Sequence, residues 1–184
     1  MDRAVILVEG KSDKAAIQAL ARRRGRDLDA EGVSVIAMGG AQAIGRSLSH
    51  YGPHGLGLEV AGLCDEGEVP EFRRGLERAG FGTNLTRDDM ERLGFFVCVA
   101  DLEDELIRAL GPERVEAIAA EQGDLTAFRT LQKQAAWNGR STHEQLRRWM
   151  GSGGRRKTRY PPLIIDALPE ADVPRPLRGL LDHI

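Results

Sequence analysis

Val5-Ile6-Leu7-Val8-Glu9-Gly10-Lys11-Ser12-Asp13 is the stretch of sequence that decides the expected fold. Residues 4–8 are apolar without interruption, which is typical of a strand buried on both faces of a parallel sheet. A helix is expected to begin at Ser12 or Asp13, because apolar residues then recur at helical spacing. Glu9 would therefore lie at the carboxyl end of a buried strand, where open α/β sheets place their ligand sites. Asp13 follows by one helical turn, and a divalent metal is the best reason for two acids in this place.

Strand patterns and helix patterns alternate in the first 111 residues. Apolar or β-branched runs predict strands at residues 4–8, 33–37, 58–64 and 94–100. Helices are predicted after these strands, at about residues 12–24, 41–48, 72–79 and 103–110. The alternation predicts an α/β fold: a Rossmann-like, mainly parallel four-stranded sheet flanked by helices.

The pattern changes to helices alone beyond Pro112. Helices are predicted at residues 112–121, 125–137 and 142–150, followed by a Gly/Ser/Arg loop at 151–159 and a tail of one or two short helices. We therefore expect an α/β domain at residues 1–111 and an all-helical C-terminal extension, residues 112–184, packed on it.

Acidic residues follow three of the predicted strands: Glu9, Asp65 and the pair Asp101 and Glu103. Because the carboxyl ends of parallel strands meet at one edge of a sheet, we expect these acids to lie together. Convergent carboxylates suit one or two hard cations such as Mg²⁺ or Mn²⁺. Two such ions can clamp the attacking and leaving oxygens of a phosphodiester. The alternative is that each acid caps the helix that follows it, and its repetition after three strands makes coincidence a weaker explanation.

Composition is that of an ordinary globular protein. The 184 residues suit one domain with a small appendage, and 41% are hydrophobic and 29% charged. Neither a run long enough for a membrane span nor the pattern of a signal peptide is found, so we expect a cytoplasmic protein without membrane contact. Cys64 and Cys98 fall in apolar stretches and are expected to be reduced core residues.

Charge is distributed unevenly along the chain. Residues 1–110 carry 19 acids and 14 bases, whereas residues 111–184 carry 9 acids and 12 bases. Six of these bases crowd into residues 147–159. An acidic part beside a basic cluster suits a metal site that acts on a polyanion, although an ordinary solvated face has the same composition.

These residues resemble the Toprim domain, which is shared by topoisomerases, bacterial primases, recombination proteins and the OLD (overcoming lysogenization defect) nucleases. Its hallmark is a Glu-Gly after the first strand, here Glu9-Gly10, and an Asp-x-Asp after a later strand. The closer resemblance is to the OLD nucleases, whose first motif has a second acid four residues on, as at Asp13. Residues 38–44, 62–65 and 101–106 are also similar to that family. The resemblance covers residues 3–110 closely and the helical tail more loosely.

The resemblance implies a phosphodiester hydrolase, a nuclease or nickase that cleaves DNA with one or two Mg²⁺ or Mn²⁺ ions. Carried over to this sequence, Glu9 and Asp13 hold one ion. The second ion falls to Asp65, Asp101 and Glu103.

OLD nucleases also use a lysine from their C-terminal part, for which Lys157 is the natural candidate. A lysine there could neutralise charge that develops on the phosphorus; a contact to the DNA backbone or a plain surface charge is the alternative. Arg155, Arg156 and Arg159 are the candidates for DNA contact.

Three glycines, Gly10, Gly39 and Gly40, are candidate contributors to the site. The backbone N–H groups of Gly39 and Gly40 precede a predicted helix and could face a phosphate. A plain tight turn is equally consistent with this pair.

Two departures from the family pattern stand out. The Asp-x-Asp motif reads Asp65-Glu66-Gly67, so the missing oxygen would have to come from Glu66 or Glu68, and the number of ions stays open. OLD proteins also carry an N-terminal ATPase, whereas this chain begins just before its first strand. We therefore expect any ATPase partner to be a separate polypeptide.

Other functions fit the sequence less well. Gly10-Lys11-Ser12 ends like a phosphate-binding P-loop, but Val5 stands where that motif needs glycine. Topoisomerase and primase activities need further domains for which the chain has no room. The alternative from a different class is a non-catalytic module that binds DNA or docks a partner, and Gly67 favours it. Hydrolysis of a small phosphorylated substrate or of RNA is a third reading.

Overall fold

The computed structural model describes residues 2–184 and contains the expected four-stranded sheet, in which every strand is parallel to its neighbours. The strands are β1 (Ala4–Val8), β2 (Val33–Ala37), β3 (Glu59–Asp65) and β4 (Phe95–Cys98), in the order β2-β1-β3-β4. The predicted fold class is therefore confirmed. β4 is shorter than expected, because residues 99–100 form a bend.

Ten α-helices accompany the sheet in residues 2–184. They are α1 (Lys11–Arg23), α2 (Ile44–Tyr51), α3 (Val69–Arg78), α4 (Arg87–Arg92), α5 (Leu102–Leu110), α6 (Pro112–Glu121), α7 (Leu125–Gln132), α8 (Thr142–Gly151), α9 (Gly154–Ala167) and α10 (Arg175–His183). Three short 3₁₀ helices are η1 (Ala41–Ala43), η2 (Glu66–Glu68) and η3 (Glu170–Asp172). Within this described part, no helix has the length and apolar character needed to cross a membrane.

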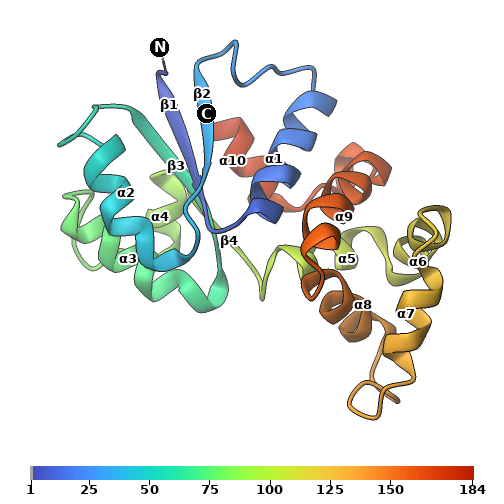
Figure 1. Cartoon of the computed structure of the whole chain (residues 1–184). Helices are drawn as coiled ribbons and strands as arrows, with labels where there is room; N and C mark the ends of the chain where they lie inside the picture. The colour runs from blue at the N-terminus through green and yellow to red at the C-terminus, as the bar shows by residue number, and fades with distance from the viewer. Residues whose placement is uncertain (1) are drawn as a thin grey trace.

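Helices cover both faces of the sheet. In Figure 1, α2, α3 and α4 lie on one side of the strands, and α1 and α10 lie on the other. Alternate residues of β1 enter the two resulting cores: Ile6 faces α1, whereas Leu7 packs in the cluster that contains Phe72 of α3. This division explains the uninterrupted apolar run, because a strand with helices on both faces has no solvent side.

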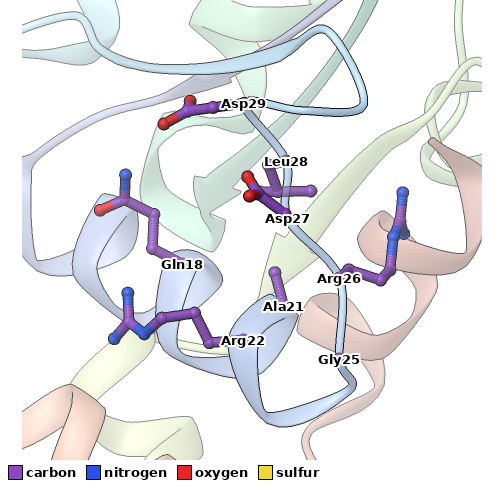
Figure 2. Close-up of a pocket in the computed structure, with 8 residues that line it drawn as sticks. All are labelled: Gln18, Ala21, Arg22, Gly25, Arg26, Asp27, Leu28 and Asp29. Carbon is purple, nitrogen blue, oxygen red and sulfur yellow. The ribbon is translucent and has the colours of Figure 1, made fainter.

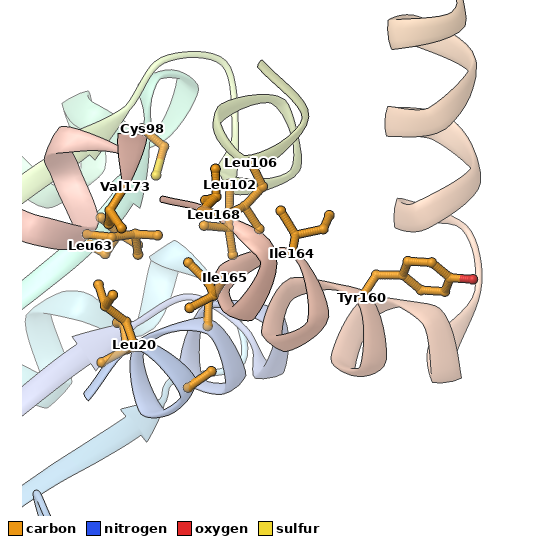
Figure 3. Close-up of a cluster of buried hydrophobic side chains, with 14 of the residues drawn as sticks. Leu20, Leu63, Cys98, Leu102, Leu106, Tyr160, Ile164, Ile165, Leu168 and Val173 are labelled. Carbon is orange, nitrogen blue, oxygen red and sulfur yellow. The ribbon is translucent and has the colours of Figure 1, made fainter. Parts of the chain in front are cut away.

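The C-terminal helices share the core on the α1 side. α9 packs along α1, and α8 packs on α5. Figure 3 shows Leu20 of α1 and Leu63 of β3 in the same buried cluster as Ile164 and Ile165 of α9. The boundary at residue 111 stays a prediction, but residues on both sides of it contribute to this one cluster.

The expected loop at residues 151–159 is wrong, because α9 already begins at Gly154 and continues to Ala167. Glycines at the start and the pair Pro161-Pro162 suggested a break, since proline removes a donor and crowds the preceding turn. Burial overrides this local preference: Tyr160, Pro161, Ile164 and Ile165 are all buried. The basic residues of this segment therefore lie on a helix.

Two further differences concern shorter helices. α7 ends at Gln132 instead of reaching Trp137, and residues 134–139 form turns. α4 lies where no helix was expected, and a capping box between Thr86 and Asp89 begins it. Cys64 and Cys98 are free and buried, as expected.

Replacing Gly62 by alanine is expected to destabilise the protein. Gly62 lies in β3 between β1 and β4, and an added Cβ would stand 2.8 Å from the carbonyl oxygen of Leu7 and 2.8 Å from the Phe95 ring. Backbone cannot yield as a flexible side chain does, so we expect a loss of about 1–3 kcal/mol in the free energy of unfolding, measured in urea. Gly67→Ala is the control, because its Cβ would meet nothing within 4 Å. Equal stability of the two variants would contradict this packing.

Candidate metal centre

Glu9 stands at the carboxyl end of β1 on a backbone that is tied down from the neighbouring turn. Its carbonyl oxygen accepts hydrogen bonds from the N–H groups of Gly39 (3.0 Å) and Gly40 (3.2 Å). Gly39 and Gly40 have φ angles of +82° and +132°, which favour glycine. The structure thus gives these two N–H groups a partner inside the protein, and the phosphate role considered above does not carry over to them.

The Glu9 carboxylate reaches a different environment from its backbone. Its Oε2 atom is buried and has no hydrogen-bond partner among the described residues. Burial, helped by the negative charge of Glu68, raises the pKa of this carboxyl, while Lys157 opposes the shift. A buried carboxylate oxygen without a hydrogen-bond partner is available to coordinate a cation.

Asp13 lies in the first turn of α1 with 9% of its surface exposed. One of its oxygens, Oδ2, accepts a hydrogen bond of 2.8 Å from the N–H of Gly10. Burial raises the pKa of Asp13 to about 6 against this hydrogen bond, and the charges of Glu103 and Glu9 add to the rise. Gly10 therefore holds Asp13 in place, and the predicted one-turn spacing brings both acids of the first motif together.

Asp65 ends β3, and Glu103 lies in the first turn of α5 after β4. The pKa of Asp65 is raised to about 8, chiefly by burial and also by the charges of four neighbouring carboxylates: Asp13, Glu9, Asp101 and Glu103. The pKa of Glu103 is raised chiefly by burial and also by Asp101. The acids predicted from three separate strand ends thus lie within electrostatic reach of one another.

Asp101 differs from the other acids because both of its oxygens are engaged. Oδ1 accepts the N–H of Asp104 and caps α5, and Oδ2 accepts Nε of Arg147 at 2.8 Å. The ion pair between Oδ2 and Nη2 of Arg147 measures 2.7 Å. Among the described residues, no base pairs in this way with Glu9, Asp65 or Glu103.

The backbone before Asp101 is held in an uncommon conformation. Ala100 has a φ of +63°, a region that residues other than glycine seldom adopt. The buried Glu105 holds the bend by accepting the N–H of Val99 at 2.8 Å, and Arg108 pairs with this carboxylate at 2.6 Å. Glu105 belongs to the motif at residues 101–106, but the sequence did not indicate that its carboxylate anchors the backbone at Val99.

Glu68 is the better of the two candidates for the oxygen that Gly67 cannot supply. Its charge raises the pKa of Glu9, so the two carboxylates are neighbours. Glu66 instead lies 3.8 Å from a nitrogen of Arg87, and its side chain is 57% exposed.

Lys157 lies in the first turn of α9, and its charge opposes the rise in the pKa of both Glu9 and Glu103, so it is close to both carboxylates. Arg156 lies over the Trp149 ring and donates to its carbonyl oxygen, and Arg159 contacts Asp124 and Gln122. Arg155 is exposed and makes no ion pair within residues 2–184. The basic residues of this helix thus have different surroundings.

The donor set fits a hard divalent cation. It offers carboxylate oxygens only, and one of them has no hydrogen-bond partner. The carboxylates repel one another, and in the described residues none of Glu9, Asp13, Asp65 and Glu103 forms an ion pair with a base. Within residues 2–184, however, no three acidic, histidine or cysteine side chains already stand as a complete set of ligands. Binding of a metal ion would therefore require some of these side chains to move.

One hollow lies far from these acids. It measures about 440 Å³ and opens at the far end of α1, as Figure 2 shows. Its lining residues are Gln18, Ala21, Arg22, Gly25, Arg26, Asp27, Leu28 and Asp29. A helix of 13 residues is roughly 20 Å long, so this hollow is remote from the acids at the start of α1.

The crowded acids predict that the metal-free protein loses stability as the pH rises. The pKa of Asp65 is about 8 in the folded protein, against about 3.9 in an unfolded chain, so folding favours the protonated form. The contribution of Asp65 to the free energy of unfolding is present in full below about pH 4 and is lost as the pH rises toward 8. After allowance for solvent screening, we expect a difference of about 1–3 kcal/mol between pH 5 and pH 8.5 in urea unfolding. Asp65→Asn should remove most of it, unlike Asp166→Asn at an exposed site; a flat profile would contradict the crowding.

Comparison with known proteins agrees with this geometry. Residues 2–66 match the family described as "Overcoming lysogenization defect protein-like, TOPRIM domain". No protein of curated function matches the chain. The resemblance to an OLD-like Toprim domain, which the motifs predicted, is confirmed.

Solved structures extend the likeness to the whole chain. The C-terminal region of the Burkholderia pseudomallei OLD protein matches with a TM-score of 0.74 and 21% identity, covering 100% of this chain and 97% of that one. The C-terminal region of the Xanthomonas campestris pv. campestris OLD protein matches with a TM-score of 0.74 and 26% identity, covering 100% and 92%. The helices after residue 111 are therefore part of the shared fold.

Proposed function

We propose that this chain, an OLD-like Toprim domain in the fold of OLD C-terminal regions, is a metal-dependent phosphodiester hydrolase that cleaves DNA. The observation that carries the proposal is the gathering of Glu9, Asp13, Asp65 and Glu103 at one edge of the sheet, where none of the four forms an ion pair with a basic side chain of the described residues. A structural role for these acids does not explain why burial and mutual repulsion are tolerated at one edge of the sheet.

Mg²⁺ or Mn²⁺ is the proposed cofactor, as one or two ions. Glu9 and Asp13 would hold one ion, and Asp65, Glu103 and Glu68 would hold the other. A bound divalent cation supplies Lewis-acid stabilisation of the phosphate oxygens and makes water a better nucleophile. Asp101 would serve mainly as the anchor of Arg147, since both of its oxygens are already engaged.

Lys157 is the proposed catalytic residue that acts on the reacting phosphate by electrostatics alone. Its positive charge would stabilise the extra negative charge of the transition state. Its electrostatic effect on Glu9 and Glu103 supports this role, because a charge near both carboxylates would also lie near a phosphate bound to a metal ion that they hold. Arg155, exposed two residues earlier on α9, would contact the DNA backbone.

Supercoiled plasmid incubated with the protein tests the proposal. We expect conversion to the nicked form with Mn²⁺ or Mg²⁺ and none with EDTA. Plasmid that stays supercoiled in both metals, with protein shown to be folded, would refute hydrolysis of DNA.

The second candidate function is a non-catalytic module that binds DNA or docks a partner. Gly67 favours it, because glycine offers no side-chain oxygen where the family motif has its second aspartate. Binding of DNA without cleavage under every metal condition would support this reading.

Gly67→Asp is expected to strengthen metal binding. The position accepts a side chain, since an added Cβ meets nothing within 4 Å. One more carboxylate at the end of β3 should tighten Mn²⁺ binding about tenfold in calorimetry. Gly67→Asn matches the size without the charge and should gain much less. Equal affinities of the two variants would mean that this position does not reach the ion.

A further inference from the structure

A second hollow lies between Asp101, at the start of α5, and residues 137–151 around α8. It measures about 330 Å³, and its walls include Trp137, Arg140, Arg147 and Arg148. Trp137 comes from the turns after α7, Arg140 from the residues just before α8, and the other two arginines from α8. Segments with different local structure thus contribute three arginines and one indole ring to the lining of one hollow.

Trp137 supports two of these arginines. The guanidinium carbon of Arg140 lies 5.2 Å from the centre of the indole ring, and that of Arg148 lies 6.0 Å from it. Contact with an aromatic face restricts a long side chain that would otherwise sample many rotamers. The indole ring is itself partly buried against the main core, so it forms a fixed base for both arginines.

The hollow has more positive charge than its carboxylates neutralise. Arg147 pairs with Asp101 at 2.7 Å, and Arg140 pairs with Glu144 at 3.4 Å. Arg148 makes no hydrogen bond or ion pair to any residue in the described part of the chain, and its contact is with the Trp137 ring. A guanidinium group that has no hydrogen bond or ion pair within the protein is free to bind an external anion.

The hollow adjoins the edge of the sheet where the acids gather. Asp101 belongs to both places: it lines the hollow, and its charge acts on Asp65 and Glu103. On its other side, Arg148 also lines a smaller hollow of about 240 Å³ together with Arg156 of α9. Positively charged side chains therefore continue from the acidic edge along α8 toward α9.

We propose that the hollow at Trp137 and Arg148 binds a backbone phosphate of the DNA strand, next to the phosphodiester that is cleaved. The inference rests on the proposed function, because it takes the strand to run from the acidic edge into the hollow. Guanidinium groups are matched to phosphate in shape and charge, and both carboxylates that line the hollow, Asp101 and Glu144, are already paired with arginines. The hollow thus positions the substrate and takes no part in the chemistry.

Binding of a labelled oligo-dT strand tests the site, with Ca²⁺ present and strand integrity checked on a gel so that cleavage is not the readout. Arg148→Ala should weaken binding about 5- to 20-fold and reduce the dependence of log Kd on log salt by about 0.7, as expected for one lost phosphate contact on a single strand. Arg73→Ala is the matched control, an exposed arginine on α3 without an ion pair in residues 2–184. Plasmid nicking by wild-type protein is measured on the same preparation.

Tryptophan emission provides a second readout. Trp149 is 1% exposed, so a change in emission on strand binding should come from Trp137 and be lost in Trp137→Phe. Equal strand affinities of the Arg148→Ala and Arg73→Ala variants would overturn the inference about the hollow. The nuclease proposal would then be judged separately, by the nicking assay. An equal emission change with inorganic phosphate at the same phosphate concentration and ionic strength would also overturn the inference, because the hollow would then be a site for free phosphate.

Discussion

Glu9→Gln is expected to abolish metal-dependent nicking of plasmid DNA, with a fall in rate of at least about 100-fold. Glutamine keeps the size of the side chain and removes the charge that a divalent cation requires. The Oε2 atom of Glu9 is buried without a hydrogen-bond partner, so in the wild type this oxygen is free to coordinate an ion. The effect should appear as weaker Mn²⁺ binding in calorimetry as well as slower nicking.

Glu59→Gln is the matched control for this variant. Glu59 lies at the opposite end of the sheet, at the start of β3, and makes a surface ion pair of 3.4 Å with Arg3. Such pairs contribute little, so its activity should equal that of the wild type. Without metal, Glu9→Gln should unfold at a urea concentration no lower than the wild type, since it removes a repelling charge. Normal nicking by Glu9→Gln would remove this residue from the site.

Lys157→Met is expected to slow cleavage about 100- to 1,000-fold while DNA affinity changes by less than about threefold. Methionine retains much of the apolar stem and removes the ammonium group, whose charge lies near Glu9 and Glu103. An interaction that matters mainly in the transition state lowers the rate without weakening the bound complex. Single-turnover cleavage and anisotropy with the same oligonucleotide measure the two quantities separately.

Arg155→Met is the control for charge alone. It removes one positive charge two residues away on the same helix, from a side chain that is exposed and without an ion pair in the described residues. We expect weaker DNA binding and a near-normal single-turnover rate from it. If Lys157→Met and Arg155→Met behave alike, Lys157 contacts the backbone and has no special place at the reacting phosphate.

The position of the acids could be predicted from sequence because it follows from topology. An apolar run that ends in Glu9-Gly10 indicates a buried parallel strand, and every parallel strand delivers its last residue to the same edge. Asp65 and Glu103 were therefore expected beside Glu9 although they are far apart in the chain. The pKa of Asp65 supports this, because after burial the charges of Asp13, Glu9, Asp101 and Glu103 contribute to its rise.

What escaped prediction depends on contacts between distant segments. The pairing of Asp101 with Arg147 joins residues 46 positions apart, and no local pattern encodes it. α9 was hidden by Pro161 and Pro162, because local propensity takes no account of the core that this helix enters. The hollow at Trp137 escaped for a similar reason: the helix predicted over residues 125–137 would have included this residue, whereas α7 ends at Gln132 and Trp137 lies in the turns that follow.

A crystal of the protein soaked in Mn²⁺ and measured at the manganese absorption edge tests the central claim most directly. The account predicts anomalous density at the carboxyl edge of the sheet, bounded by Glu9, Asp13, Asp65 and Glu103, and lost in the Glu9→Gln crystal. No density at that edge at saturating Mn²⁺, with these carboxylates turned toward basic side chains, would contradict it.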